Sequence, residues 1–194
     1  MKKIIFILLI FILNNNSAYS IEPDVFVQST VNRASQILSK NISKEQKIEE
    51  LKTIARETVD IKGVGFYSLG SARKNLNDNQ KKQYLDLFEN YFLKSFSSRL
   101  AEYTNPEIDV KSKELLNENY TIVNSLLIAT TERPEVKIDW RIYTKNPNNP
   151  QIRDLIIEGL SLARTQKEEF ASILNSNDGD INALFKTLEE FSNN

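Results

Sequence analysis

The sequence contains no cysteine and no histidine among its 194 residues. Disulfides, thiol nucleophiles and imidazole-based acid–base catalysis are therefore excluded. The usual zinc and iron sites are excluded as well, because cysteine and histidine are their main ligands. Carboxylates remain, but they are spread along the chain without a paired motif. We therefore predict that the protein is not an enzyme and holds no metal and no cofactor, and a carboxylate-based enzyme stays only as a third alternative.

The chain also lacks an excess of positive charge. It has 25 lysine and arginine residues against 26 acidic residues, which gives a net charge of −1. Binding to nucleic acid depends on clustered lysine and arginine side chains that neutralise phosphates. We therefore expect no nucleic-acid partner.

Long apolar runs are absent apart from one near the N-terminus, which covers residues 4–13. Ten residues are too few to span a hydrocarbon core of ~30 Å, which needs about twenty. Two lysines precede this run and a small-x-small site ends at Ser20, which is the pattern of a secretory signal peptide. We predict a signal peptide over residues 1–20, cleaved after Ser20 or Ala18, and a single domain over residues 21–194. The mature domain then keeps 23 basic and 26 acidic residues, a net charge of about −3.

Helical periodicity dominates the first half of this domain. Apolar residues recur at spacings of three and four, and Ser43 and Asn77 each stand three residues before a glutamine, the capping-box pattern of a helix start. Asp24 and Asp60 can cap two further helices. The expected helices cover residues 24–38, 43–58, 60–70 and 77–103.

The second half of the domain changes to an apolar period of two. In the clearest example, Val136, Ile138, Trp140 and Ile142 alternate with more polar residues, as in a half-buried antiparallel strand. The expected strands cover residues 108–111, 120–130, 136–143 and 152–157, and helices return over residues 160–174 and 180–191.

This order of elements predicts an α+β fold with one twisted four-stranded antiparallel sheet wrapped with helices. A twisted sheet that curls around a long helix forms a cone with an open end. Such a cone is either filled by its own side chains or holds a ligand, and the pattern leaves both possibilities open.

The expected helix over residues 77–103 carries an aromatic face. Its members are Tyr84, Phe88, Tyr91, Phe92 and Phe96. On one interpretation this face is ordinary core, as on most amphipathic helices. On the other, part of it borders a cavity.

Two further features also have a structural and a functional interpretation. As core, Trp140 needs an acceptor for its indole N–H, whereas as a pocket wall it offers a wide apolar surface. Neighbouring basic residues usually form a solvated surface, but near a cavity mouth they could hold a phosphate headgroup. The basic pairs are Arg73 with Lys74, Lys81 with Lys82, and Lys111 with Lys113.

The segment Asp154–Leu174 is the most informative part of the chain. A short apolar run joins through Glu158-Gly159 to a helix-compatible stretch with Thr165-Gln166-x-x-Glu169-Phe170, and we expect the strand to pass straight into the helix at this joint. Together with Val136-x-Ile138-Asp139-Trp140-Arg141 and with Val64–Gly70, the segment resembles the MlaC (toluene-tolerance) family of periplasmic phospholipid-binding proteins, auxiliary components of a lipid ABC transport system.

The resemblance implies a cystatin-like cone with an apolar cavity, and a soluble carrier that shuttles phospholipid across the periplasm to maintain outer-membrane lipid asymmetry. It implies three partners: phospholipid, an inner-membrane ABC transporter complex with a substrate-binding ring, and an outer-membrane lipoprotein complex. The alternative is a periplasmic chaperone or binding module for another apolar ligand or a polypeptide.

In such a carrier we expect the acyl chains to lie between the sheet and the helices, with the headgroup near solvent. The side chains expected to contact the lipid are Phe66, Leu69, Phe88, Phe92, Phe96, Ile122, Leu126, Val136, Ile138, Trp140, Ile156, Ala163 and Phe170.

Overall fold

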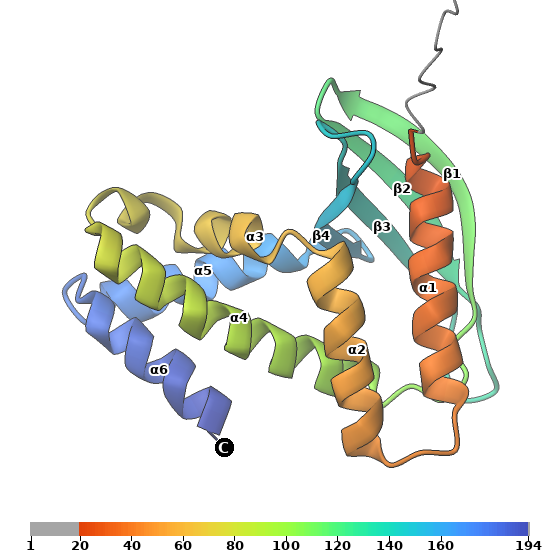
Figure 1. Ribbon diagram of the computed structural model, residues 1–194, viewed down its shortest axis with the longest axis horizontal. Helices are drawn as coiled ribbons and strands as arrows, with labels where there is room; N and C mark the ends of the chain where they lie inside the picture. The colour runs from red at the N-terminus through yellow and green to blue at the C-terminus, as the bar shows by residue number, and fades with distance from the viewer. Residues whose placement is uncertain (1–19, 194) are drawn as a thin grey trace, which may run out of the picture.

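The computed structural model describes residues 20–193 (Figure 1), so the predicted signal peptide lies outside the described residues apart from Ser20. The elements of the described part are α1 (Pro23–Ser39), α2 (Lys44–Thr58), α3 (Ile61–Leu69), the 3₁₀ helix η1 (Gly70–Lys74), α4 (Asp78–Leu100), β1 (Ile108–Asn117), β2 (Tyr120–Leu127), β3 (Val136–Tyr143), β4 (Gln151–Ile157), β5 (Leu160–Ser161), α5 (Leu162–Asn175) and α6 (Ile181–Asn193). Within residues 20–193, no helix combines the length and the apolar character that crossing a membrane requires.

Most predicted helix starts are confirmed by side-chain caps. Ser43 and Asn77 each accept a hydrogen bond from the backbone N–H three residues on, at 3.2 and 2.9 Å, and the glutamine at that position completes a capping box. The prediction that Asp24 caps α1 is wrong. The helix begins at Pro23, and Asp24 lies in its first turn, where it pairs with Lys113 instead.

The predicted antiparallel sheet is confirmed, but it has five strands rather than four, in the order β1-β2-β3-β4-β5. The fifth strand is two residues long and pairs with the end of β4. It forms because Glu158 and Gly159 have φ angles of 49° and 82°, which turn the chain back on itself as in a tight hairpin. The strand therefore does not pass straight into a helix at this joint, and Leu160 belongs to β5, whereas α5 begins at Leu162.

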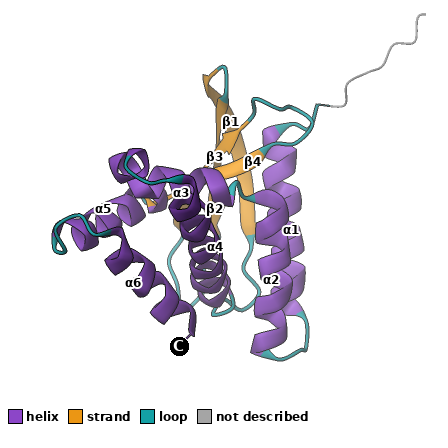
Figure 2. Ribbon diagram, turned by 60° about the vertical axis from the view of Figure 1, so that its left-hand side comes forward, coloured by secondary structure: helices purple, strands orange, loops and turns teal. Residues whose placement is uncertain are grey.

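The helices form two groups beside the sheet (Figure 1). One face of the sheet is covered by α1, which packs on β1 and β2, whereas α3 and α5 contact β4. Figure 2 shows α3, α4, α5 and α6 gathered on one side of the molecule and α1 on the other. At the β4 edge Val59 forms a parallel bridge with Ile152, and the Asp60 N–H donates to the Ile152 carbonyl at 3.0 Å. The helix that lies along the sheet is thus α1, while the longest helix, α4, packs on α2, α3 and α6.

Trp140 lies in the main core and is only 6% exposed. Its indole N–H donates to the Ser125 hydroxyl at 2.8 Å, and that hydroxyl donates to the Ile138 carbonyl at 3.0 Å. The acceptor that a core tryptophan needs is therefore present. Of the two interpretations of Trp140, the structure supports the core.

Arg153 fastens the start of α3 to β4. Its guanidinium pairs with Asp60, the N-cap of α3, and its Cζ lies 4.4 Å from the centroid of the Tyr143 ring. It also lies against Gly63, where a Cβ would come within 2.6 Å of the same Cζ. Glycine at this position costs the helix about 1 kcal/mol relative to alanine, but it leaves the space that the guanidinium occupies.

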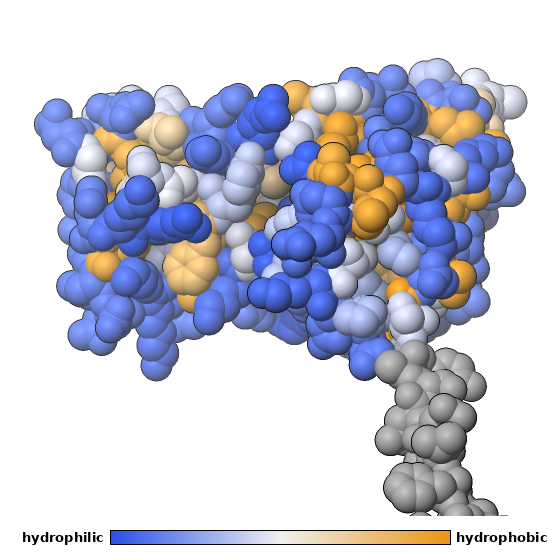
Figure 3. Space-filling view, turned by 90° about the horizontal axis from the view of Figure 1, so that it is seen from above, coloured by the Kyte–Doolittle hydropathy of each residue, from blue (hydrophilic) through white to orange (hydrophobic). Residues whose placement is uncertain are grey.

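The free edge of the sheet is polar along most of β1. Residues 111–118 are all exposed, and charged side chains on such an edge discourage pairing with other chains. The exceptions are Leu115 and Leu116 near the hairpin end, which are 74% and 51% exposed. The view from above in Figure 3 shows apolar patches within a largely hydrophilic surface.

Removing the acceptor of the Trp140 N–H tests how much this buried bond contributes. We expect Ser125→Ala to lower the free energy of unfolding by about 1–3 kcal/mol, because a buried donor then has no partner. Adding Trp140→Phe removes the orphaned donor, so the double variant should lose less than the sum of the two single losses. Urea unfolding of the four proteins measures this coupling, and strict additivity would contradict it.

Lys113 ties the start of α1 to the sheet. Its Nζ lies 2.6 Å from Asp24 Oδ1 and 2.5 Å from Glu22 Oε2. The hydrogen bond from Lys113 holds the pKa of Asp24 below its ordinary value of 3.8, and the bonds to Asp24 and Glu22 raise the pKa of Lys113 above 10.5. The stabilisation from Asp24 is present above pH 3.8 and is lost as the pH falls through the lower folded pKa. The stabilisation from Lys113 is present below pH 10.5 and is lost as the pH rises through the higher pKa of Lys113 in the folded protein.

We therefore expect Lys113→Met to lower the melting temperature at about pH 7, with the difference from the unmodified protein shrinking as the pH falls through the lowered pKa of Asp24 and its carboxylate becomes protonated. Salt at about 0.5 M should also shrink the difference, because the pairs lie at the surface. Lys111→Met is the matched control, since the partner of Lys111 is Asp109 on the same strand. Thermal melts at a series of pH values, followed by circular dichroism, measure the effect, and a loss that does not change with pH would contradict it.

Candidate functional site

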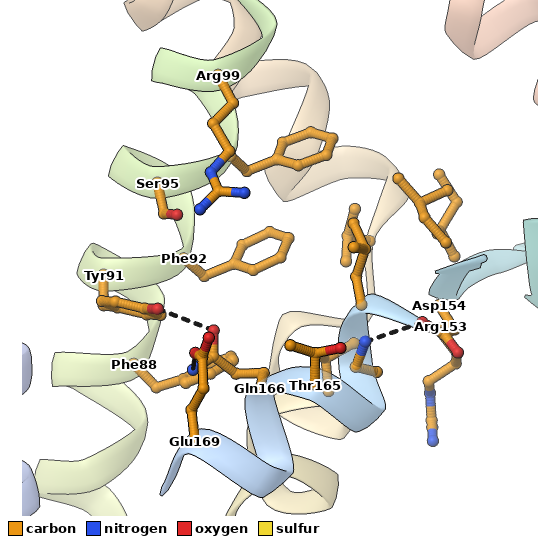
Figure 4. Close-up of a pocket in the computed structure, with 17 residues that line it drawn as sticks. Phe88, Tyr91, Phe92, Ser95, Arg99, Arg153, Asp154, Thr165, Gln166 and Glu169 are labelled. Carbon is orange, nitrogen blue, oxygen red and sulfur yellow. Dashed lines mark hydrogen bonds between the residues drawn. The ribbon is translucent and has the colours of Figure 1, made fainter. Parts of the chain in front are cut away.

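A cavity of about 170 Å³ lies where α4 and α5 meet β4, beside the junction of α2 and α3 (Figure 4). Its wall is formed by Val59, Val64, Phe88, Tyr91, Phe92, Ser95, Phe96, Arg99, Ile152, Arg153, Asp154, Leu155, Leu162, Ala163, Thr165, Gln166 and Glu169.

The interior of the cavity is apolar. Phe88, Phe92 and Phe96 follow one another at intervals of four along α4 and therefore share one face of the helix. The Phe92 ring stacks on its two neighbours, with centroid distances of 6.1 Å to Phe88 and 5.5 Å to Phe96. Ile152 and Leu155 contribute the apolar side of β4. The structure thus supports the interpretation that part of the aromatic face borders a cavity.

A β-bulge in β4 places Ile152 and Leu155 on the same side of the sheet. The ladder between β3 and β4 shifts its register at Arg153, which has no partner on β3. An extra residue of this kind interrupts the regular alternation of side chains. As a result Leu155, rather than Asp154, lies on the same face as Ile152.

Asp154 connects β4 to the first turn of α5. The residue is 5% exposed, and its carboxylate accepts hydrogen bonds from the Ser161 hydroxyl at 2.6 Å and from the Ala163 N–H at 3.0 Å, while Arg141 Nη1 lies 3.5 Å away. These bonds fix Ala163 in the cavity wall. Among the acidic residues of the described part, Asp154 is the one that is buried, and three structural donors surround it rather than a second acid. No group of ligands suited to a metal ion occurs within residues 20–193.

The mouth of the cavity is polar. The Tyr91 hydroxyl donates to Gln166 Oε1 at 2.8 Å, and Gln166 Nε2 donates to Glu169 Oε2 at 3.0 Å, so that a chain of hydrogen bonds links α4 to α5. Burial is the main cause that raises the pKa of Tyr91, which keeps the phenol protonated as a donor. Ser95 and Arg99 complete the polar side of α4 (Figure 4).

The Thr-Gln-x-x-Glu-Phe motif has two roles in this arrangement. Its polar members line the cavity. Phe170, by contrast, is buried behind the wall, edge-on to Phe88 with centroids 6.1 Å apart and 5.9 Å from the Tyr91 ring. The motif therefore aligns polar groups at the mouth and anchors the helix that carries them.

The structure brings together only some of the predicted contact residues. Those in the cavity wall are Phe88, Phe92, Phe96 and Ala163. Leu69, Ile122, Ile138, Trp140 and Phe170 are buried outside the wall, and Phe66, Leu126, Val136 and Ile156 are half-buried outside it. The sheet contributes β4 rather than β2 and β3, because the helices that enclose the cavity gather at the β4 edge.

Several residues of the wall were not predicted as contacts. Ser95 and Arg99 continue the stripe of Phe88 and Phe92 at spacings of three and four, so the helical period contained this signal. Leu155 reaches the cavity only because of the bulge, which the apolar pattern of the strand does not reveal.

The basic pairs considered as a phosphate site do not line the cavity. Lys81 and Lys113 form ion pairs with carboxylates at the surface. Arg73 and Lys74 are exposed on η1. These positions favour the interpretation that the basic pairs belong to the solvated surface. The basic residue that the structure places at the mouth of the cavity is Arg99.

Comparisons with known proteins agree on one family. A family model described as MlaC protein matches residues 28–190. The "Intermembrane phospholipid transport system binding protein MlaC" of Haemophilus influenzae is 23% identical over 178 residues, which cover 88% of this chain and 83% of that protein.

A solved structure has the same fold. It is that of a phospholipid-binding protein from Ralstonia solanacearum in complex with a phospholipid. The TM-score is 0.75 at 20% sequence identity, and the match covers 89% of this chain and 97% of the other. Because the MlaC family model matches most of the length of this chain, the chain belongs to the MlaC family.

Proposed function

We propose that this protein is a phospholipid carrier that holds acyl chains in the cavity between α4, α5 and β4. The observation that carries the proposal is an apolar interior closed by a polar mouth, the arrangement that an amphipathic lipid requires. The solved structure of the same fold contains a phospholipid, and the Haemophilus protein is named for phospholipid transport. In this proposal Phe88, Phe92, Phe96 and Ala163 contact the acyl chains, and Phe170 supports Phe88 from behind.

The size of the cavity implies that it opens when lipid enters. Its volume of about 170 Å³ is close to that of an engineered cavity of ~150 Å³ that accepts benzene. Sites for drug-sized ligands measure about 300–1,000 Å³. The cavity as described therefore has room for part of one acyl chain, and two full chains require its walls to move apart.

The free energy of transferring acyl chains into water explains why such a carrier is needed. Moving a methylene group out of water is worth ~0.8 kcal/mol, so two tails with roughly thirty methylenes represent on the order of 20 kcal/mol. A lipid that leaves a membrane unaided loses most of this energy. A protein that covers the tails removes much of the barrier without chemistry, so the proposed carrier is not an enzyme and needs no cofactor.

We further propose that the carrier works in the periplasm. Family membership and the pattern of a signal peptide over residues 1–20 support this location. The protein would exchange lipid with an inner-membrane ABC transporter complex that carries a substrate-binding ring and with an outer-membrane lipoprotein complex. This exchange would help to maintain the lipid asymmetry of the outer membrane.

Phe92→Glu tests the assignment of the cavity. Phe92 is half-buried in the wall, so the variant should fold, but a carboxylate inside an apolar cavity is strongly unfavourable. We expect phospholipid that co-purifies with the protein to fall about tenfold or more relative to the unmodified protein. The measurement is organic extraction of protein purified without detergent, followed by mass spectrometry.

Phe66→Glu is the matched control, because Phe66 is half-buried but lies outside the cavity wall. It should keep its lipid, and circular dichroism should show that both variants are folded. A folded Phe92→Glu protein with the original lipid content would contradict the cavity assignment. Peptide in the extract of the unmodified protein, in place of phospholipid, would support the chaperone alternative.

A further inference from the structure

Two opposite charges stand at the mouth of the cavity, one on each helix. Arg99 lies on α4 and Glu169 on α5, and both side chains line the cavity (Figure 4). Both residues are exposed. None of the ion pairs found within residues 20–193 includes either of them. Both charges therefore remain available to a ligand.

The helices themselves offer these charges no partner. The α5 side chains three and four residues away from Glu169 are all uncharged. One of them, Gln166, donates the one hydrogen bond that Glu169 receives in the described structure. Glu102 follows Arg99 at a spacing of three, but it pairs with Lys44 of α2. Charges on a helix surface can pair at these spacings, and neither Arg99 nor Glu169 does so within the described residues.

Tyr91 lines the same cavity as the two charges, and both affect its pKa. Burial is the largest cause that raises the pKa of Tyr91, and the hydrogen bond with Gln166 opposes it. The negative charge of Glu169 raises the same pKa further, and the positive charge of Arg99 lowers it. Both charges therefore lie within electrostatic range of one hydroxyl at the mouth, where the partly desolvated wall strengthens such interactions.

We propose that Arg99 and Glu169 form a headgroup site that selects zwitterionic phospholipids over anionic ones. The inference rests on the proposed carrier function. Arg99 binds the phosphate, because a guanidinium presents paired N–H groups that match phosphate oxygens. Glu169 binds the ammonium group of the same headgroup.

An anionic phospholipid fits this pair less well. It offers the same phosphate to Arg99, but it has no ammonium group for Glu169. The carboxylate of Glu169 then faces a headgroup of net negative charge, and like charges repel each other. The two residues therefore contribute differently: Arg99 to the affinity for any phospholipid, and Glu169 to the choice between headgroups.

A competition experiment tests this division. Delipidated protein is incubated with vesicles of equal amounts of phosphatidylethanolamine and phosphatidylglycerol, separated from them and extracted for mass spectrometry. The unmodified protein should carry phosphatidylethanolamine in an excess of about threefold or more, the range expected for one exposed ion pair. Glu169→Gln should bring the ratio of the two lipids close to one, whereas Arg99→Gln should lower the uptake of both lipids by a similar factor.

Glu168→Gln and Arg73→Gln are the matched controls, since both residues are exposed and neither lines the cavity. They should behave as the unmodified protein does. Full lipid loading with a ratio near one, unaffected by Glu169→Gln, would overturn the headgroup site and leave the carrier function standing. Failure of the unmodified protein to take up either lipid would overturn the carrier function and, with it, the headgroup site.

Discussion

The buried carboxylate of Asp154 stands where the sheet meets the helices, and the geometry of the cavity depends on it. A charge in this position is unfavourable unless donors surround it. Here the donors come from β5, from the first turn of α5 and from Arg141 on β3. The requirement to satisfy one carboxylate therefore fixes the direction in which α5 leaves the sheet. That direction in turn places Ala163 and the polar residues of α5 opposite the aromatic face of α4.

The base and the mouth of the cavity differ in how firmly they are held. At the base, Asp154 anchors α5 and Arg153 anchors α3, both through charged hydrogen bonds to β4 or its neighbours. At the mouth, α4 and α5 are joined by the bond between Tyr91 and Gln166 and by aromatic contacts. Aromatic packing is less directional than charged hydrogen bonds, and regions held by few such bonds open more easily. A carrier needs this combination, because the site must keep its shape and still admit and release long chains.

The sequence was sufficient to predict what depends on local periodicity and on local caps. The helix starts at Ser43 and Asn77 and the alternation along β3 follow from residues only a few positions apart. The placement of the cavity could not be predicted in this way, because it depends on the bulge at Arg153 and on the turn at Glu158-Gly159. Both features change which side chains share a face without changing the apolar pattern. The predicted contacts on α4 therefore lie in the cavity wall, whereas those on the sheet, on β2, on β3 and at Ile156 of β4, lie outside it.

The central claim is that acyl chains occupy the space between α4, α5 and β4. The most direct measurement is photo-crosslinking with a phospholipid that carries a diazirine near the end of one acyl chain, followed by mapping of the modified peptides. The account predicts adducts in the cavity-lining parts of these elements, within residues 88–99, 152–155 and 162–169. Adducts confined to other surfaces, such as the exposed end of the β1–β2 hairpin around Leu115 and Leu116, would contradict it.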